Sequence, residues 1–154
     1  MRLNVIGRMA RHMREDLLLS PIAGEERLGV AFVRYASSYN RSVVVLTEYR
    51  ALPNDGYVEL VSAPVSFDVR WFMAEAERAA SVNAGVFLVH LHDHYGMPWF
   101  SPIDMRTNRE VLLPISCVDH TLPTGALILS RDRGAAALAQ AGRLVAVNVA
   151  EVPG

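Results

Sequence analysis

Hydrophobic residues recur at helical spacing near the start of the chain and are then concentrated in short apolar runs. Across residues 8–19, Met9, Met13 and Leu17 recur every four positions between charged residues, which predicts an amphipathic helix. Residues 28–35 and 42–49 are rich in apolar and β-branched side chains and predict two strands. Because the connection between these strands is short, we expect them to pair antiparallel.

Strands and helices continue to alternate along the rest of the chain. Ser66 or Asp68 can cap a helix that ends near Ser81. The apolar stripe of this helix comprises Val69, Phe72, Met73, Ala76 and Ala79 or Ala80. Further strands are expected over residues 57–61, 85–92, 115–118, 126–130 and 144–149. A helix is expected over residues 102–110, limited by Pro114, and the Ala-rich residues 134–142 predict a short surface helix or loop.

The composition indicates one folded domain. With 154 residues, of which 51% are hydrophobic, the chain can bury a core, and we expect a single domain over residues 1–154. A formal net charge of −1 gives no electrostatic footprint for nucleic acid or a membrane surface, so neither is expected as a partner.

No apolar stretch approaches the roughly 20 residues that cross a bilayer. The apolar run within residues 1–8 is too short for a signal peptide, which predicts a cytoplasmic protein. The one cysteine, Cys117, lies in an apolar run and is expected to be a buried, inert thiol.

A pair of histidines in the predicted strand 85–92 supplies candidate metal ligands. His90 and His92 are two residues apart, so on a strand both point to the same face, with Cα atoms roughly 7 Å apart. After a short loop, Ser101 and Pro102 predict a helix start, and Asp104 lies over the same first turn. Two imidazoles and a carboxylate around an open fourth position are typical of a catalytic rather than a structural zinc. We therefore predict one Zn²⁺ held by His90, His92 and Asp104.

Glu26 supplies the remaining group that a hydrolytic site needs. It precedes the predicted strand 28–35 and, as a carboxylate that is not a ligand, could take a proton from water at the zinc. The order Glu-x-x-Gly (Glu26 to Gly29), His-x-His and Ser-x-x-Asp resembles the JAMM (MPN-plus, JAB-domain) zinc metalloprotease family. The family usually has seven residues between the second His and the Ser. This chain has eight, residues 93–100, in a predicted loop where an added residue is tolerated.

The resemblance implies a fold, an activity and partners. The fold would be an α/β domain of the MPN (JAB) type, a mixed, mostly antiparallel β-sheet flanked by helices in a cytidine-deaminase-like arrangement. Glu26 would be the general base and Ser101 the donor to the oxyanion. The reaction would be hydrolysis of the peptide or isopeptide bond after the C-terminal Gly of a ubiquitin-like protein, whose tail would bind by β-augmentation. Like the stand-alone prokaryotic members, the chain would work beside the activating and conjugating enzymes of a bacterial conjugation or defence system, or in a sulfur-carrier setting.

Several assignments stay open in the sequence. His94 continues the alternation and would give a three-His site if the strand extended further, while Asp93 could orient a ligand imidazole. Glu25 competes with Glu26, although the spacing to Gly29 favours Glu26. Two other functions are also compatible with the pattern: a non-catalytic MPN-type interaction scaffold without metal, and a zinc amidase or peptidase acting on another small peptide.

Overall fold

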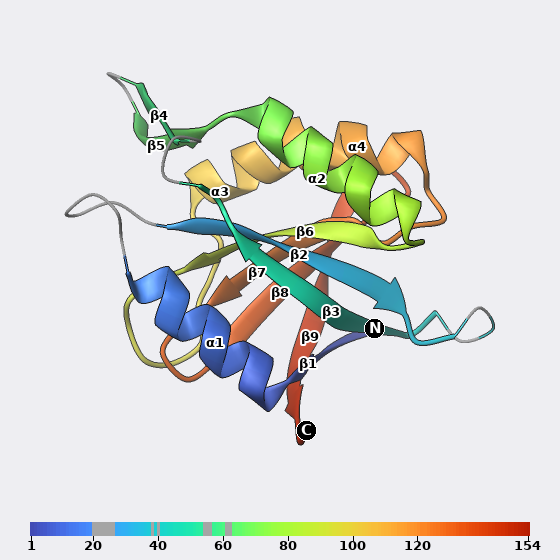
Figure 1. Cartoon of the computed structure of the whole chain (residues 1–154), viewed down its shortest axis with the longest axis horizontal. Coiled ribbons are helices and arrows are strands. Elements are labelled where there is room, and N and C mark those ends of the chain that lie inside the picture. Colours follow the sequence, from blue (N-terminus) through green and yellow to red (C-terminus); the bar gives the residue numbers. More distant parts are fainter. Residues whose placement is uncertain (20–26, 38, 40, 54–56, 61–62) are drawn as a thin grey trace.

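Seven strands form a closed barrel in the computed structural model, which describes residues 1–19, 27–37, 39, 41–53, 57–60 and 63–154 (Figure 1). Around the barrel the order is β1 (Arg2–Ile6), β3 (Val43–Ala51), β2 (Leu28–Tyr35), β6 (Gly85–Leu91), β7 (Gly125–Leu129), β8 (Gly134–Gln140) and β9 (Arg143–Val152). β1 pairs parallel with β3 and with β9, and β6 pairs parallel with β7. The other neighbouring strands are antiparallel. β4 (Tyr57–Leu60) and β5 (Ala63–Phe67) form a separate two-stranded ribbon.

The expected fold class, a mixed, mostly antiparallel sheet of the MPN (JAB) type flanked by helices, is wrong. The finding that overturns it is the pairing of β1 on both of its sides. Residues Arg2, Leu3 and Asn4 lie opposite Val43, Val44 and Val45, and the whole of β1 also lies opposite Asn148–Val152 of β9. The two ends of the sheet are therefore joined through β1, and a sheet joined in this way has no open edge.

Helices lie on two sides of the strands (Figure 1). α1 (Gly7–Leu18) packs on one side, and α2 (Val69–Ser81) lies on the other with a continuous run of α3 (Pro102–Thr107), a π-helical turn (Asn108–Leu112) and α4 (Leu113–Val118). In the part of the chain that the structure describes, no helix has the length and apolar character needed to cross a membrane.

Two buried clusters follow from the alternation of side chains along the strands. On β6, Phe87, Val89 and Leu91 face the cluster inside the barrel, which also takes up the buried side chains of α1. Val86 and Leu88 point the other way, into a cluster shared with Phe72 of α2 and Leu112 of the π-helical turn. Successive residues of a strand alternate between faces, so His90 lies on the side of the second cluster, toward the α3–α4 run.

α2 buries a different stripe from the one expected. Phe72 and Ala79 are buried, but Val69 is 42% and Met73 is 51% exposed. Glu75 is buried instead, because it pairs with Arg78 and with Arg50 of β3. Asp68 caps the helix through a hydrogen bond from the backbone N–H of Arg70, as one of the two expected caps.

Two element assignments near the C-terminal half are also wrong. Residues 115–118 belong to helix α4 rather than to a strand, because Pro114 sits in its first turn, where a missing N–H removes no intrahelical bond. Cys117 on this helix is exposed, so the expectation of a buried thiol is wrong as well. Of the Ala-rich residues 134–142, Gly134–Gln140 form strand β8, which pairs with β7 on one side and β9 on the other. Two ladders of backbone hydrogen bonds outweigh the weak strand preference of Ala.

Candidate metal centre

The end of β6 and the start of α3 bring three potential metal ligands together. His90 lies near the end of β6, where its Cα pairs with Leu28 of β2 and Ile128 of β7, and it is 4% exposed. β6 ends at Leu91, one residue earlier than expected, and the backbone N–H of His92 donates to the carbonyl of Leu129 at 2.8 Å. His92 therefore continues the direction of the strand and stays on the same side as His90. Their ring centroids are 5.0 Å apart.

Asp104 faces both imidazoles. Its Oδ1 lies 3.3 Å from Nε2 of His90, and its Oδ2 lies 3.5 Å from Nε2 of His92. One donor atom from each of the three residues lies within 4.8 Å of the other two. The three side chains that the sequence picks out as ligands therefore lie together, and their role as metal ligands stays a prediction.

A capping box holds Asp104 in this orientation. The backbone N–H of Asp104 donates to Oγ of Ser101 at 3.1 Å, and the backbone N–H of Ser101 donates to Oδ2 of Asp104 at 2.8 Å. The cap uses Oγ of Ser101 as an acceptor, so the hydroxyl proton of this residue is compatible with a second partner. Burial opposes ionisation of Asp104, but the His90 imidazole and the Ser101 amide hold the pKa of its carboxyl well below the usual range.

The donor set fits a divalent cation with nitrogen and oxygen ligands. Ligand atoms about 2.0–2.1 Å from a tetrahedral zinc lie roughly 3.3–3.4 Å from one another. Oδ1 of Asp104 lies 3.3 Å from Nε2 of His90, close to this separation, while the 3.5 Å contact with His92 is made by the other carboxylate oxygen. Nε2 of His90 is buried and makes no hydrogen bond within the described residues. A buried imidazole nitrogen that lies 3.3 Å from a carboxylate oxygen needs a proton or a cation between the two groups.

His94 and Asp93 lie outside this group. Nδ1 of His94 lies 2.9 Å from the carbonyl oxygen of Tyr95, and its ring stacks on Trp99 at 5.4 Å between centroids. His94 is not among the residues whose donor atoms converge with Asp104 in the described chain. The Asp93 carboxylate is 60% exposed and pairs with Arg131 instead of with an imidazole. The structure therefore favours the two-His, one-Asp set over the three-His alternative.

Glu26 and its rival Glu25 lie outside the described residues, so the predicted general base stays a prediction. Leu28, two residues after Glu26, is described and pairs with His90. Sequence reasoning missed Arg14, Ser130 and Asp132, whose polar groups contact the loop after His92 or the turn beside it. No local sequence signal marks these three residues, because each acts across a long separation along the chain.

No protein-family model matches the sequence, and the search of curated proteins gives no match.

Proposed function

We propose that this protein is a zinc-dependent metallopeptidase that cuts the peptide or isopeptide bond after the C-terminal Gly of a ubiquitin-like protein. The observation that carries the proposal is the convergence of His90, His92 and Asp104 from a strand end and a helix start. The motif resemblance to the JAMM metalloproteases supplies the substrate class. We also propose that the protein acts in the cytoplasm, with a ubiquitin-like protein or its conjugates as partner.

Each residue of the candidate metal centre would have a separate role in the reaction. His90, His92 and Asp104 would hold the ion, and the Ser101 amide keeps the Asp104 carboxylate in place. Bound zinc would supply Lewis acidity toward the scissile carbonyl and toward water. The Ser101 hydroxyl would donate a hydrogen bond to the substrate carbonyl oxygen as negative charge develops there.

Glu26 would move the proton. As the water oxygen bonds to the carbonyl carbon, Glu26 would accept a proton from that water. It would then deliver the proton to the leaving nitrogen as the C–N bond breaks, so that the products are a carboxylic acid and an amine. No covalent bond to the enzyme is needed in this sequence.

The barrel restricts how an extended substrate tail could bind. β-Augmentation needs a strand with an unpaired edge, and each barrel strand already pairs on both sides. Among the described strands, β4 and β5 pair only with each other. We therefore propose that a tail bound by β-augmentation would add to the β4–β5 ribbon.

A matched pair of glutamate variants tests the proposal. The purified protein, loaded with Zn²⁺, is incubated with a ubiquitin-like precursor that carries extra residues after its C-terminal Gly, and with an isopeptide-linked conjugate. Glu26→Ala should retain about one zinc per chain but cleave about 10²–10⁴-fold more slowly, because proton transfer is lost. The control Glu25→Ala should cleave at the parental rate.

Each alternative function predicts a different result. A parent protein that binds no zinc would favour the non-catalytic scaffold. Zinc-dependent cleavage of small peptides or amides, with no cleavage of the precursor or conjugate, would favour the amidase. Parental cleavage by Glu26→Ala would disprove the assignment of the base.

A further inference from the structure

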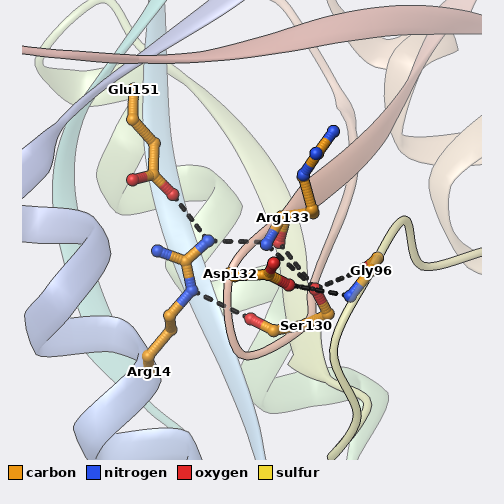
Figure 2. Close-up of polar contacts among 6 residues, drawn as sticks. All are labelled: Arg14, Gly96, Ser130, Asp132, Arg133 and Glu151. Carbon is orange, nitrogen blue, oxygen red and sulfur yellow. Dashed lines mark hydrogen bonds and ion pairs between the residues drawn. The ribbon is translucent and has the colours of Figure 1, made fainter.

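The turn between β7 and β8, residues 130–133, is hydrogen-bonded to the loop that follows His92. The backbone N–H of Arg131 donates to the carbonyl of His94 at 2.8 Å, and Nε of Arg131 bonds the Asp93 carboxylate at 2.5 Å. Further along the loop, Ser130 and Asp132 both bind Gly96 (Figure 2). The loop is therefore tied to this turn at three of the eight residues that separate His92 from Ser101.

Gly96 is held by both of its peptide groups. Its N–H donates to Oδ1 of Asp132 at 2.8 Å, and its carbonyl oxygen accepts from Oγ of Ser130 at 2.7 Å (Figure 2). Its φ of +91° lies in the left-handed region that favours glycine. The chain thus changes direction at a residue whose position is fixed from both sides.

Ser130 and Asp132 together form what we call the Gly96 clamp, and Ser130 is its buried residue. It is 0% exposed, and its hydroxyl gives its one proton to Gly96 while it accepts the backbone N–H of Arg133 at 2.9 Å. Its backbone N–H donates to the carbonyl of Arg133, also at 2.9 Å. Hydrogen bonds within the turn therefore hold its shape independently of its contacts with the loop, which makes the turn a rigid support.

Arg14 ties the same turn to helix α1. Nε of Arg14 donates to the carbonyl of Ser130 at 2.9 Å, and its terminal nitrogen donates to the carbonyl of Arg133 at 3.1 Å (Figure 2). The guanidinium also pairs with Glu151 of β9 at 2.5 Å. A planar cation with several donors suits this task, because one side chain can bind two carbonyls and a carboxylate at once.

We propose that Ser130 and Asp132 are positioning residues for the metal centre, an inference that rests on the proposed function. The loop they hold connects His92 to the capping box that carries Asp104, and both of its ends are anchored. Fixing Gly96 between those ends limits how far His92 and Asp104 can separate when no cation holds them. Loss of the clamp should therefore weaken cation binding, although neither residue touches the cation.

Binding of Co²⁺ alone tests this inference without any substrate. The dissociation constant is measured by competition with a chromophoric chelator, and the visible absorption of bound Co²⁺ reports the geometry of the ligands. Ser130→Ala should weaken binding by up to about 10-fold, the lower end of the effect of removing a group bonded directly to a metal ligand, because Ser130 acts through Gly96. Asp132→Ala should weaken it in the same direction, whereas Asp132→Asn should bind almost as the parent does, because the amide oxygen can still accept from Gly96.

The control is Ser116→Ala. Ser116 also donates its hydroxyl to a backbone carbonyl, that of Leu113 at 2.7 Å, but on helix α4. This variant should bind Co²⁺ as the parent does. If Ser130→Ala fails to fold, the comparison of Asp132→Ala with Asp132→Asn still tests the positioning role, because Asp132 is exposed.

The two possible failures are distinct. If the parent binds Co²⁺ but Ser130→Ala and Asp132→Ala bind it equally well with unchanged spectra, the positioning role is wrong and the proposed function stands. If the parent itself takes up no Co²⁺ or Zn²⁺, the proposed function fails.

Discussion

Asp104 has two roles that a pair of substitutions can separate. Its Oδ2 accepts a hydrogen bond from the Ser101 amide in the capping box, while its Oδ1 lies 3.3 Å from Nε2 of His90. Asp104→Asn keeps an oxygen that can accept from Ser101 but loses the negative charge that a zinc ligand provides. Asp104→Ala loses both.

The expected magnitudes differ enough to be resolved. Loss of a capping interaction costs about 0.5–2 kcal/mol, and for a domain of this size each kcal/mol shifts Tm by about 2–4 °C. A ligand present at about 1,000 times its Kd stabilises by about 4.1 kcal/mol, equivalent to about 8–16 °C. Without metal, Asp104→Asn, which loses only the charge, should therefore melt below the parent at neutral pH, and Asp104→Ala, which also loses the cap acceptor, should melt a few degrees lower still. With zinc, both should lose most of the parental increase in Tm.

Thermal unfolding, followed by circular dichroism in EDTA and then in buffered Zn²⁺, measures both effects. The control is His120→Ala, which removes an exposed imidazole outside the metal centre and should keep the full zinc-dependent shift. A full shift in Asp104→Asn would show that zinc binds elsewhere or without this carboxylate, and the ligand assignment would be refuted.

Three further predictions concern the pKa of Asp104, the hydroxyl of Ser101 and the orientation of α2. Since the pKa of Asp104 is held below its usual value near 3.9, its ionised form stabilises the metal-free fold above about pH 4 and this contribution is lost on acidification. The difference in free energy of unfolding between the parent and Asp104→Asn, measured in urea, should therefore narrow as the pH falls from about 5 to 2; a constant difference would contradict it. Ser101→Ala should bind zinc but lose about 10²–10³-fold in kcat, with KM little changed, in steady-state cleavage assays, because the donor to the substrate oxygen is gone; an unchanged kcat would remove Ser101 from the mechanism. Phe72→Ala, at a fully buried position, should cost about 3–5 kcal/mol in urea unfolding, while Met73→Ala, at a position 51% exposed, should stay within about 0.5 kcal/mol; similar costs would contradict the observed orientation of α2.

Local patterns predicted the elements that carry the candidate ligands. β2 begins and ends at the expected residues, and β6 differs from expectation by one residue at its end. The Ser101–Pro102 helix start is also as expected, with a full capping box. These features depend on side-chain periodicity and on cap chemistry, and both act over a few neighbouring residues.

Barrel closure could not be predicted in the same way. It depends on β1, a five-residue strand near the N-terminus, lying beside β9 near the other end of the chain. Nothing in the residues of β1 specifies two parallel partners. The Ala-rich strand β8 was missed for a related reason, because its conformation depends on the strands on either side rather than on its own weak preference.

The same distinction separates the candidate ligands from the residues that support them. The His-x-His spacing places two imidazoles on one face of any strand, so these ligands are recognisable without knowledge of the fold. Ser130 reaches the ligand loop only because β7 lies parallel to β6 in one register, with Ile128 opposite His90 and Leu129 opposite Leu91. A shift of that register by one residue would turn the β7 side chains to the opposite face and move Ser130 away from Gly96. The affinity of the centre for a cation should therefore depend on the pairing of β6 with β7 as well as on the three ligands themselves.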